Sequence, residues 1–245
     1  MNILEKIKLL PDALQGFLFS DPERNGEYRF IRKIIAEGMI VFDVGANIGE
    51  YSEYISNLSD NLDFHCFEPS RNTFAKLQER FSQYHTKNNF HLNNFGLSNI
   101  EESLELYIYN ETGGSNSIYF NEQFAENKNF VKKEIIQVRK LDDYIDENKI
   151  KSIDLLKIDV EGHEYKVING CIESLKKGII KTIQFEYNNY WLKSGAKLLE
   201  MLKFLESYNY KFYRLTPWGK VRIKNFVSSL ENYKHSNYIA LLNDN

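Results

Sequence analysis

Cysteine, proline and long hydrophobic runs are all scarce in this chain of 245 residues. The two cysteines, Cys66 and Cys171, are too few for a disulfide framework or a four-cysteine zinc site, so we expect reduced thiols in a cytoplasmic protein. No apolar run approaches the roughly 20 residues that a membrane-spanning helix needs. Residues 1–19 include Glu5 and Asp12 and lack an uninterrupted apolar stretch, so we do not expect a signal peptide.

An excess of charge of one sign is also missing. The chain has 31 Lys and Arg against 34 Asp and Glu, for a net charge of −3, and both signs are mixed along it. Because no polybasic stretch stands out, nucleic acid is not an expected partner. Hydrophobic residues make up 42% and aromatic residues 14% of the chain, which excludes disorder and suffices for a sizeable core.

No linker rich in Pro, Gly or Ser divides the chain. We therefore predict a single domain over residues 39–245, preceded by an N-terminal helical segment over residues 1–38 that packs on it. Within that segment Ile3, Ile7 and Leu10 share one helical face, which favours an amphipathic helix.

What the sequence does contain is a regular alternation of short apolar runs with helix-length amphipathic stretches. This alternation predicts βαβ units, and hence an α/β, Rossmann-like fold with a mostly parallel sheet and helices on both faces. The predicted strands cover residues 39–44, 62–67, 90–95, 153–159, 182–186, 211–215 and 238–242, and the predicted helices cover 49–58, 72–84, 163–175 and 196–208.

The stretch from about 100 to 140 breaks this alternation. Residues 104–109 and 135–138 have the pattern of extended segments, and a short helix is expected to begin near Asp142. Residues 113–117, Gly-Gly-Ser-Asn-Ser, form either an ordinary turn or a flap over a site. We interpret the whole stretch as a β-rich insertion.

Polar residues follow the predicted parallel strands where each strand ends. The first strand ends in Asp-Val-Gly-Ala-Asn-Ile-Gly (43–49), the second in Glu68, the third near Asn94, the fourth in Asp-Val-Glu-Gly-His-Glu (159–164) and the fifth in Glu186. Ligands of open α/β sheets bind at the carboxyl ends of the strands. The sequence therefore predicts a crevice for a polar ligand at this edge.

The turn at 43–49 points to the kind of ligand. It is neither the G-x-G-x-x-G dinucleotide motif nor a phosphate-binding loop with Lys. Asp43 without a nearby basic residue suits a cationic cofactor such as S-adenosylmethionine better than a pyrophosphate. Glu68, 19 residues after Gly49, is placed to accept both hydroxyls of a ribose.

Five motifs in order carry a family resemblance. They are VFDVGANIGEYS (41–52), CFEPS (66–70), NNFGLSN (93–99), LLKIDVEGHEYKVINGC (155–171) and IQFEYN (183–188). Together they resemble the FkbM family of class I S-adenosylmethionine-dependent methyltransferases, from about Glu27 to the C-terminus. The resemblance implies a seven-stranded sheet with its last strand antiparallel, and O-methylation of a hydroxyl on a sugar, glycan or secondary metabolite.

The resemblance also implies roles for residues at the strand ends. The turn would cradle the methionine part of the cofactor, Glu68 would hold its ribose and Asn94 would lie near its adenine amine. Asp159 borders the expected position of the methyl group. The expected cofactor-binding residues are Asp43, Gly45, Ala46, Asn47, Gly49, Glu68, Asn94 and Asp159.

An acceptor hydroxyl gains from a positioned base as its proton leaves. We expect that base to be Asp159 or His163, with Glu161 beside them. Lys157 has the same strand parity as Asp159, and a buried ion pair explains it at least as well as catalysis does.

A Mg²⁺ ion is a second option. Asp159 and Glu186 with Asn188 or Asn189 resemble the oxygen ligands of catechol-type O-methyltransferases. We nevertheless assign no metal ligands, because acidic strand ends also occur without metal.

Other interpretations stay open. The aromatic group Tyr187, Tyr190, Trp191 and Trp218 is either a stacking floor for an acceptor or core packing. The alternative functions are an NAD-type oxidoreductase, which the missing dinucleotide motif disfavours, and a non-catalytic binding module, which the intact turn disfavours.

Overall fold

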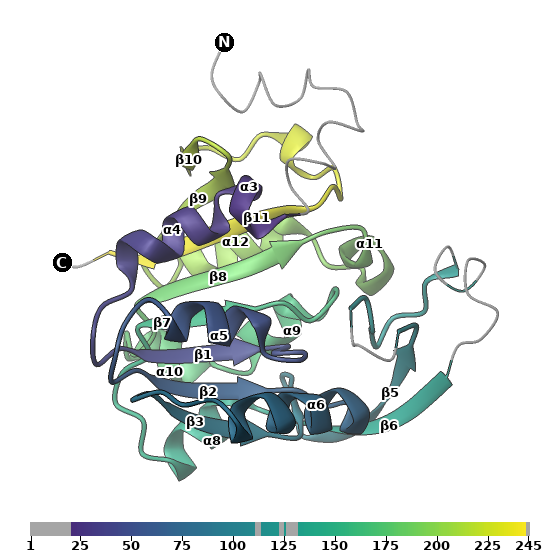
Figure 1. Cartoon of the computed structure of the whole chain (residues 1–245). Helices are drawn as coiled ribbons and strands as arrows, with labels where there is room; N and C mark the ends of the chain where they lie inside the picture. Colours follow the sequence, from purple (N-terminus) through teal and green to yellow (C-terminus); the bar gives the residue numbers. More distant parts are fainter. Residues whose placement is uncertain (1–20, 111–113, 123–124, 126–131, 244–245) are drawn as a thin grey trace.

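An eight-stranded sheet in the order β10-β9-β11-β8-β7-β1-β2-β3 runs through the molecule (Figure 1). The computed structural model describes residues 21–110, 114–122, 125 and 132–243, so the amphipathic helix expected near the N-terminus lies outside the described residues. The strands of this sheet are β1 (Ile40–Val44), β2 (Asp63–Phe67), β3 (Asn89–Asn93), β7 (Leu155–Ile158), β8 (Thr182–Tyr187), β9 (Tyr210–Thr216), β10 (Gly219–Ile223) and β11 (Ser236–Leu242).

The strand directions confirm the predicted Rossmann-like class I methyltransferase sheet. Strands β3, β2, β1, β7 and β8 pair in parallel, and β11, the last in sequence, is antiparallel to both of its neighbours, β8 and β9. The resemblance implied seven strands, and β10 adds an eighth. It forms a hairpin with β9, and its alternating half-exposed residues gave too little apolar signal to be recognised.

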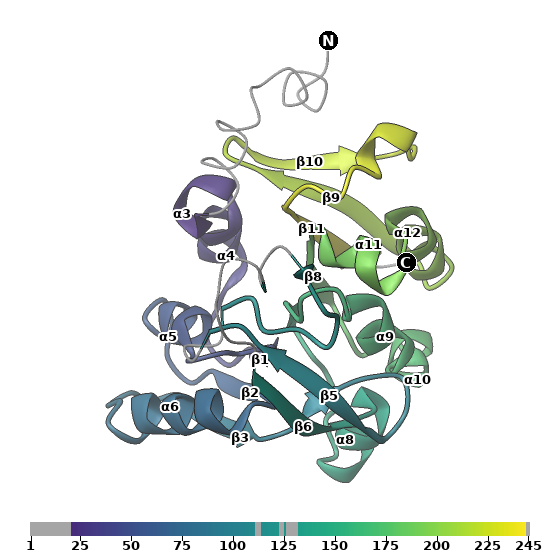
Figure 2. The same cartoon turned by 90° about the vertical axis from the view of Figure 1, so that its right-hand side faces the viewer.

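Helices cover both faces of the sheet, which explains why the central strands are apolar without alternation. Phe30, Ile55 and Leu77 are buried on the face covered by α4, α5 and α6, whereas Tyr144 and Val167 belong to the core under α8, α9, α10 and α12 (Figures 1 and 2). The helices are α3 (Pro22–Asn25), α4 (Glu27–Ile34), α5 (Glu50–Ser56), α6 (Arg71–Ser82), α8 (Leu141–Glu147), α9 (Glu164–Asn169), α10 (Ile172–Lys176), α11 (Tyr190–Ser194), α12 (Leu198–Glu206) and the 3-10 turn η1 (Ser228–Leu230).

The helix predicted over 163–175 is instead two helices, α9 and α10. The chain bends at Gly170, where a Cβ would lie 2.0 Å from the carbonyl oxygen of Ser98. The Gly170 carbonyl accepts a hydrogen bond from the amide of Asp142 at 3.0 Å. Contacts with two distant segments therefore outweigh the local helical pattern.

The predicted β-rich insertion is present as a separate three-stranded sheet (Figure 2). Its strands are β4 (Gly96–Leu97), β5 (Glu102–Ile108) and β6 (Lys132–Arg139), with β5 and β6 antiparallel and β4 parallel to β6. Leu106, Ile136 and Val138 form its own small apolar cluster.

Helix α4 lies against the sheet near β9 and β10 and contributes Phe30 and Ile31 to the core. The division into a segment at 1–38 and a domain at 39–245 stays a prediction. Both cysteines are free and buried. Among the described residues, no helix is long and apolar enough to cross a membrane.

Candidate functional site

Two clefts open at the carboxyl ends of the parallel strands, where β1 separates β2 from β7 and the strand order reverses. The first has a volume of about 820 Å³ and is walled on one side by the insertion. The second has a volume of about 740 Å³ and is bordered by α4 and the segment before β11. Gly45, Asn47 and Asp159 line both clefts, so the two are continuous at the first turn.

The turn after β1 is shaped by contact with the end of β7. Gly45 has φ +81°, and a Cβ there would lie 1.9 Å from the carbonyl oxygen of Asp159, so only glycine fits. The amides of Gly45 and Ala46 both donate to the Phe67 carbonyl at 3.0 Å. Asn47 Oδ1 is buried and has no hydrogen-bond partner among the residues that the structure describes, which leaves an acceptor at the junction of the clefts.

Glu68 faces the first cleft and is held by backbone amides. Its carboxylate accepts from the N–H of Asn47 at 3.0 Å and from the N–H of Ser70 at 2.9 Å. Burial raises the pKa of Glu68 to about 7, although these two donors favour the charged form. The carboxylate is therefore fixed in orientation at the end of β2.

Two residues expected at the cofactor lie elsewhere. Gly49 lines neither cleft; it begins α5 with φ +87°, and a Cβ would lie within 2.7 Å of Phe81 and Leu77. Asn94 is exposed, and its amide donates to the carbonyls of Glu68 and Pro69. Strand β3 ends at Asn93, so the chain turns before it reaches the cleft, and Gly96 and Leu97 line the wall instead.

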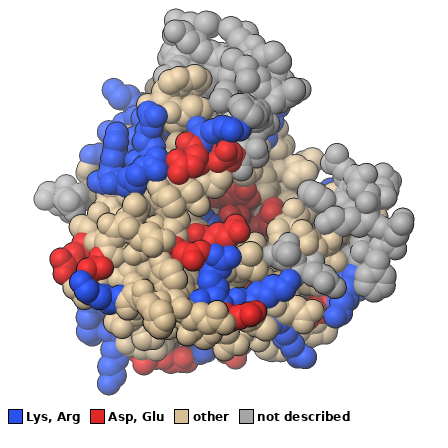
Figure 3. Space-filling model, viewed as in Figure 1, with Lys and Arg blue, Asp and Glu red and all other residues tan. Residues whose placement is uncertain are grey.

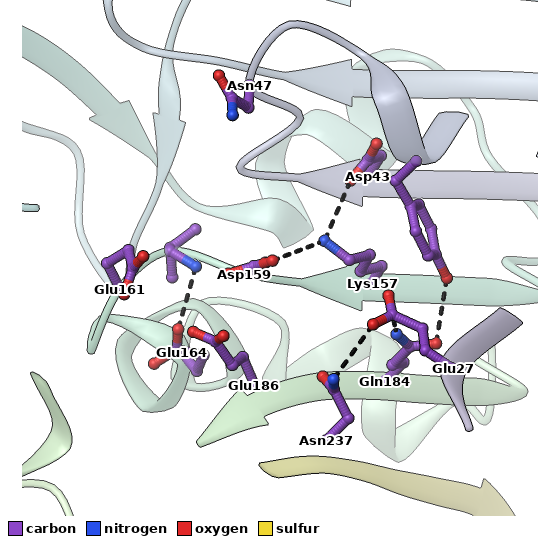
Figure 4. Close-up of polar contacts among 12 residues, drawn as sticks. Glu27, Asp43, Asn47, Lys157, Asp159, Glu161, Glu164, Gln184, Glu186 and Asn237 are labelled. Atoms are coloured by element: carbon purple, nitrogen blue, oxygen red, sulfur yellow. Dashed lines mark hydrogen bonds and ion pairs between the residues drawn. The ribbon is translucent and has the colours of Figure 1, made fainter. Parts of the chain in front are cut away.

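A buried charged network lies beneath the second cleft (Figure 4). The Lys157 ammonium is 3.0 Å from Asp159 Oδ2 and 4.0 Å from Asp43 Oδ1, and it lies over the ring of Tyr51. Burial alone would lower the pKa of Lys157, but the carboxylates of Asp159 and Asp43 outweigh it and raise the pKa. Lys157 is therefore an ion-paired residue, as its strand parity suggested.

Asp43 and Asp159 respond differently to this network. Burial raises the pKa of Asp43 although it faces Lys157 and accepts a hydrogen bond from Ser52 at 2.7 Å. For Asp159 burial acts in the same direction, but the contact with Lys157 outweighs it and lowers the pKa. Asp159 therefore stays ionised and is a weak proton acceptor.

Glu27 joins this network from α4, which sequence analysis did not anticipate. Gln184 donates to Glu27 Oε1 at 2.9 Å and Asn237 donates to Oε2 at 3.2 Å (Figure 4). These bonds connect α4 with β8 and with β11, the last strand. A lone Glu in an amphipathic helix gives no signal of such a role, because the contact depends on the tertiary arrangement.

His163 lines the first cleft, but both ring nitrogens are already bonded. Nε2 lies 3.0 Å from Ser98 Oγ, and Nδ1 lies 3.0 Å from Tyr119 Oη. Burial, followed by the nearby Lys166 ammonium, lowers the pKa of His163 to about 4. The imidazole of His163 is therefore neutral and joins the start of α9 to the insertion. This geometry does not favour a role as proton acceptor.

The loop between β7 and α9 concentrates carboxyl groups. Glu164 accepts from the amides of Val160 and Gly162 and so orders the loop, and burial raises its pKa to about 8. Glu161 accepts from the Asn188 amide at 2.7 Å, and burial followed by repulsion from Glu186 raises its pKa well above the usual value.

A histidine that the sequence analysis missed faces the second cleft. His235 Nδ1 lies 2.8 Å from Glu186 Oε1. Burial opposes the charged form of His235, but Glu186 outweighs it and raises the pKa. The antiparallel register of β11 on β8, with Asn237 opposite Glu186, creates this pair, whereas the sequence pattern predicts the last strand only from Tyr238.

Three of the four residues in the aromatic group pack in the core. Tyr187, Tyr190 and Trp191 are at most 1% exposed, and the Trp191 indole donates to the Glu186 carbonyl at 3.1 Å. Trp218 is exposed in the turn between β9 and β10. The three buried rings line neither cleft and offer no stacking floor. Of the expected flap, Gly114, Ser115 and Asn116 do line the first cleft, whereas Gly113 lies outside the described residues.

Acidic side chains gather in the hollow at the middle of the face shown in Figure 3. The arrangement combines a carboxylate fixed by two backbone amides, a turn that only glycine permits, and a His–Glu pair. A fixed carboxylate and a glycine turn at the strand ends are compatible with an adenosine cofactor.

Comparisons with known proteins agree with this arrangement. The model of the methyltransferase FkbM domain matches residues 43–212. "Methyltransferase 1" of Beauveria bassiana is 27% identical over 194 residues, covering 69% of this chain and 76% of that protein. The 2-O-methyltransferase NoeI of Sinorhizobium fredii is 25% identical over 165 residues, covering 64% of this chain and 66% of that protein.

Solved structures share the fold at low sequence identity. A candidate rRNA methylase from Clostridium thermocellum has a TM-score of 0.53 at 12% identity, covering 89% of this chain and 94% of that one. A candidate methyltransferase from Streptococcus mutans, solved with S-adenosylhomocysteine, has a TM-score of 0.50 at 11% identity, covering 87% and 94%. The fold, the strand-end motifs and the family match over most of the sheet lead to one conclusion: the chain belongs to the FkbM-domain family of S-adenosylmethionine-dependent methyltransferases.

Proposed function

We propose that this methyltransferase transfers the methyl group to a hydroxyl of a sugar, glycan or secondary metabolite. The observation that carries the proposal is the His235–Glu186 pair in the second cleft, which meets the first cleft at Gly45, Asn47 and Asp159. A hydroxyl needs a proton acceptor at the moment of transfer, and this pair supplies one. The name of NoeI, a 2-O-methyltransferase, supports the same reaction class.

The residues of the first cleft fit S-adenosylmethionine. Glu68 would accept both ribose hydroxyls, because its carboxylate is fixed by two amides and faces the cleft. Gly45, Ala46 and Asn47 would hold the methionine part at the junction, where Asn47 Oδ1 lacks a partner in the described structure. Asp43 and Asp159 would provide negative charge beneath it. When bound, the cofactor supplies an activated methyl on a sulfonium, so the protein mainly has to position the acceptor in line.

His235 is the base that the geometry favours. Its Nδ1 is held by Glu186, so Nε2 remains to take the hydroxyl proton. The earlier candidates fit less well: Asp159 is ion-paired with Lys157, and both nitrogens of His163 are bonded. Glu161, with its raised pKa, remains a second candidate base beside the junction.

The charge of the second cleft indicates which kind of acceptor could bind there. Its described lining includes five carboxyl groups against one Lys and one His; the carboxyls belong to Glu27, Asp43, Glu50, Asp159 and Glu186. An anionic acceptor would meet repulsion there, whereas neutral hydroxyls find many hydrogen-bond acceptors. We therefore expect the acceptor to be an uncharged polyol or sugar rather than a phosphorylated or carboxylated one.

The test is methyl transfer from labelled S-adenosylmethionine to panels of neutral glycosides, uronic acids and phenolic or polyketide alcohols. Acid-stable, base-stable label on a hydroxyl oxygen of a neutral acceptor supports the proposal. Label found only on nitrogen or carbon acceptors would contradict it. Binding of S-adenosylhomocysteine with no transfer to any panel or to cell extract would favour the non-catalytic alternative.

The residues proposed for Mg²⁺ do not fit that ion. Asp159 Oδ2 is bonded to the Lys157 ammonium, and Glu186 Oε1 and Oε2 are bonded to His235 and to the Asn188 amide. Asn189 is exposed. We predict that EDTA leaves the initial rate of methyl transfer unchanged. Loss of activity with EDTA, restored by Mg²⁺ alone, would contradict this.

Replacing Glu68 with Ala should weaken S-adenosylhomocysteine binding by about tenfold or more, because two charge-assisted hydrogen bonds to the ribose are lost. In the wild type, affinity should rise with pH through about 7, where Glu68 ionises. Calorimetry across pH 5.5–8.5 measures both effects. Glu79→Ala, an exposed carboxylate on α6, is the matched control and should change neither; equal affinity for Glu68→Ala and wild type would show that Glu68 does not hold the ribose.

A further inference from the structure

A cluster of two histidines and one aspartate lies on β2 and β3, from the amino end to the middle of these strands. Asp63 and His65 are two residues apart on β2 and share one face, and His91 on β3 pairs in register with His65. Strand β3 is the edge of the sheet. Asp63 begins β2, about 16 Å along the strand from Glu68, which follows its last residue, and none of the three residues lines either cleft. The proposed methyl transfer does not use it.

The three side chains bring their ligand atoms together. His91 Nε2 lies 2.9 Å from Asp63 Oδ1, and His65 Nε2 lies 3.7 Å from Asp63 Oδ2. One ligand atom from each residue lies within 4.8 Å of the others. Ligands around a tetrahedral Zn²⁺ are about 2.0 to 2.2 Å from the metal and so a little over 3 Å apart, which these atoms reach with small shifts.

His65 provides an independent sign of a missing ligand. Its side chain is 3% exposed, and Nε2 is buried without a hydrogen-bond partner in the described structure. Such an orphaned nitrogen carries a cost in a folded protein and calls for a physical reason. His65 Nε2 faces the Asp63 carboxylate, which also contacts the solvent-exposed His91.

The other nitrogen of His65 is held as metal ligands usually are. Nδ1 lies 2.8 Å from the Tyr144 hydroxyl on α8, which also accepts from the Asn93 amide at 3.3 Å. With the proton on Nδ1, the lone pair of Nε2 is available.

We propose that Asp63, His65 and His91 form a binding site for a zinc-like divalent transition-metal ion, with water completing the coordination at the solvent side. Two imidazole nitrogens and one carboxylate suit Zn²⁺, Ni²⁺ or Cu²⁺, whereas Ca²⁺ and Mg²⁺ require oxygen ligands. The rings of His65 and His91 are stacked at 4.5 Å with 15° between their planes, and the half-exposed His91 ring is free to make the small shift that binding requires. The metal ties β2 to the edge strand and is structural.

Zinc binding to the chelator-stripped full chain tests the site. We expect one Zn²⁺ per chain in competition with a chromophoric chelator, and a Tm raised by about 5 °C at saturating Zn²⁺. His91→Ala should weaken binding by about tenfold or more and abolish the Tm increase. His91 is half exposed, so this variant keeps the fold; Asp63→Asn, with nearly unchanged shape, is the second variant.

His85→Ala is the matched control, because His85 is an exposed histidine outside the cluster. It should bind Zn²⁺ as the wild type does. Equal binding by wild type, His91→Ala and Asp63→Asn would overturn the proposal, as would the absence of one-equivalent binding to the wild type. The result is independent of the acceptor, because these measurements need no methyl transfer.

Discussion

Replacing His235 with Gln should reduce kcat by about 100- to 10,000-fold, the usual range for loss of a positioned base. Gln retains a polar side chain of similar size but cannot take a proton at neutral pH. Affinity for S-adenosylhomocysteine should stay within about twofold, because the cofactor residues lie at the turn and at Glu68. Single-turnover kinetics together with calorimetry separate the two quantities. His85→Gln, at an exposed histidine, should leave both unchanged.

The pH profile adds a second measurement. His235 acts when neutral, and Glu186 raises its pKa above 6.5, so the rate should fall as the pH drops through that raised value. Glu186→Gln removes the negative partner and should shift this midpoint down towards 6.5 or below, since burial then acts unopposed. A profile that is the same in both proteins, or full kcat in His235→Gln, would show that another group takes the proton.

Replacing Gly45 with Ala should weaken S-adenosylhomocysteine binding by about 100-fold or more. The added Cβ would lie 1.9 Å from the Asp159 carbonyl oxygen, so the turn and the end of β7 have to separate, which displaces Asn47 and Asp159 together. Alanine at φ +81° adds a local cost of about 1 to 2 kcal/mol. Calorimetry and thermal unfolding would measure the two losses.

Gly38→Ala is a control that separates the cost of a positive φ from the cost of a steric clash. Gly38 has φ +78° but nothing within 4 Å of an added Cβ, so it pays a similar conformational cost of about 1 kcal/mol without a clash. Its cofactor affinity should match the wild type. If Gly45→Ala loses stability like Gly38→Ala yet keeps its affinity for S-adenosylhomocysteine, the close approach at Asp159 does not shape the cofactor site.

The alternation of apolar runs and helices was enough to predict the parallel sheet, its two covered faces and the insertion, because burial on both faces leaves a strong pattern. The same pattern did not predict strand β10 or the break at Gly170. Strand β10 is half exposed, and the break depends on Ser98 and Asp142, which are distant in the sequence.

The site residues also divide into those that local motifs predict and those that depend on contacts between distant segments. Gly45, Asn47 and Glu68 stand in local motifs, and the structure places them at the clefts. Asn94 lies outside the clefts because β3 ends at Asn93, two residues before the predicted end of this strand. The sequence did not predict roles for His235 and Glu27, because each contacts its partners only when segments distant in the sequence pack together. The roles of all these residues stay predictions for the experiments above.

The contacts of Glu27 and His235 carry a consequence for synthesis on the ribosome. Glu27 reaches Asn237, 210 positions along the chain, and His235 meets Glu186 only when the final strand inserts between β8 and β9. Contacts between such distant segments form late in folding. We therefore expect a nascent chain to fold the part of the sheet from β1 to β8 first, and to acquire methyltransferase activity only after the last strand has left the exit tunnel.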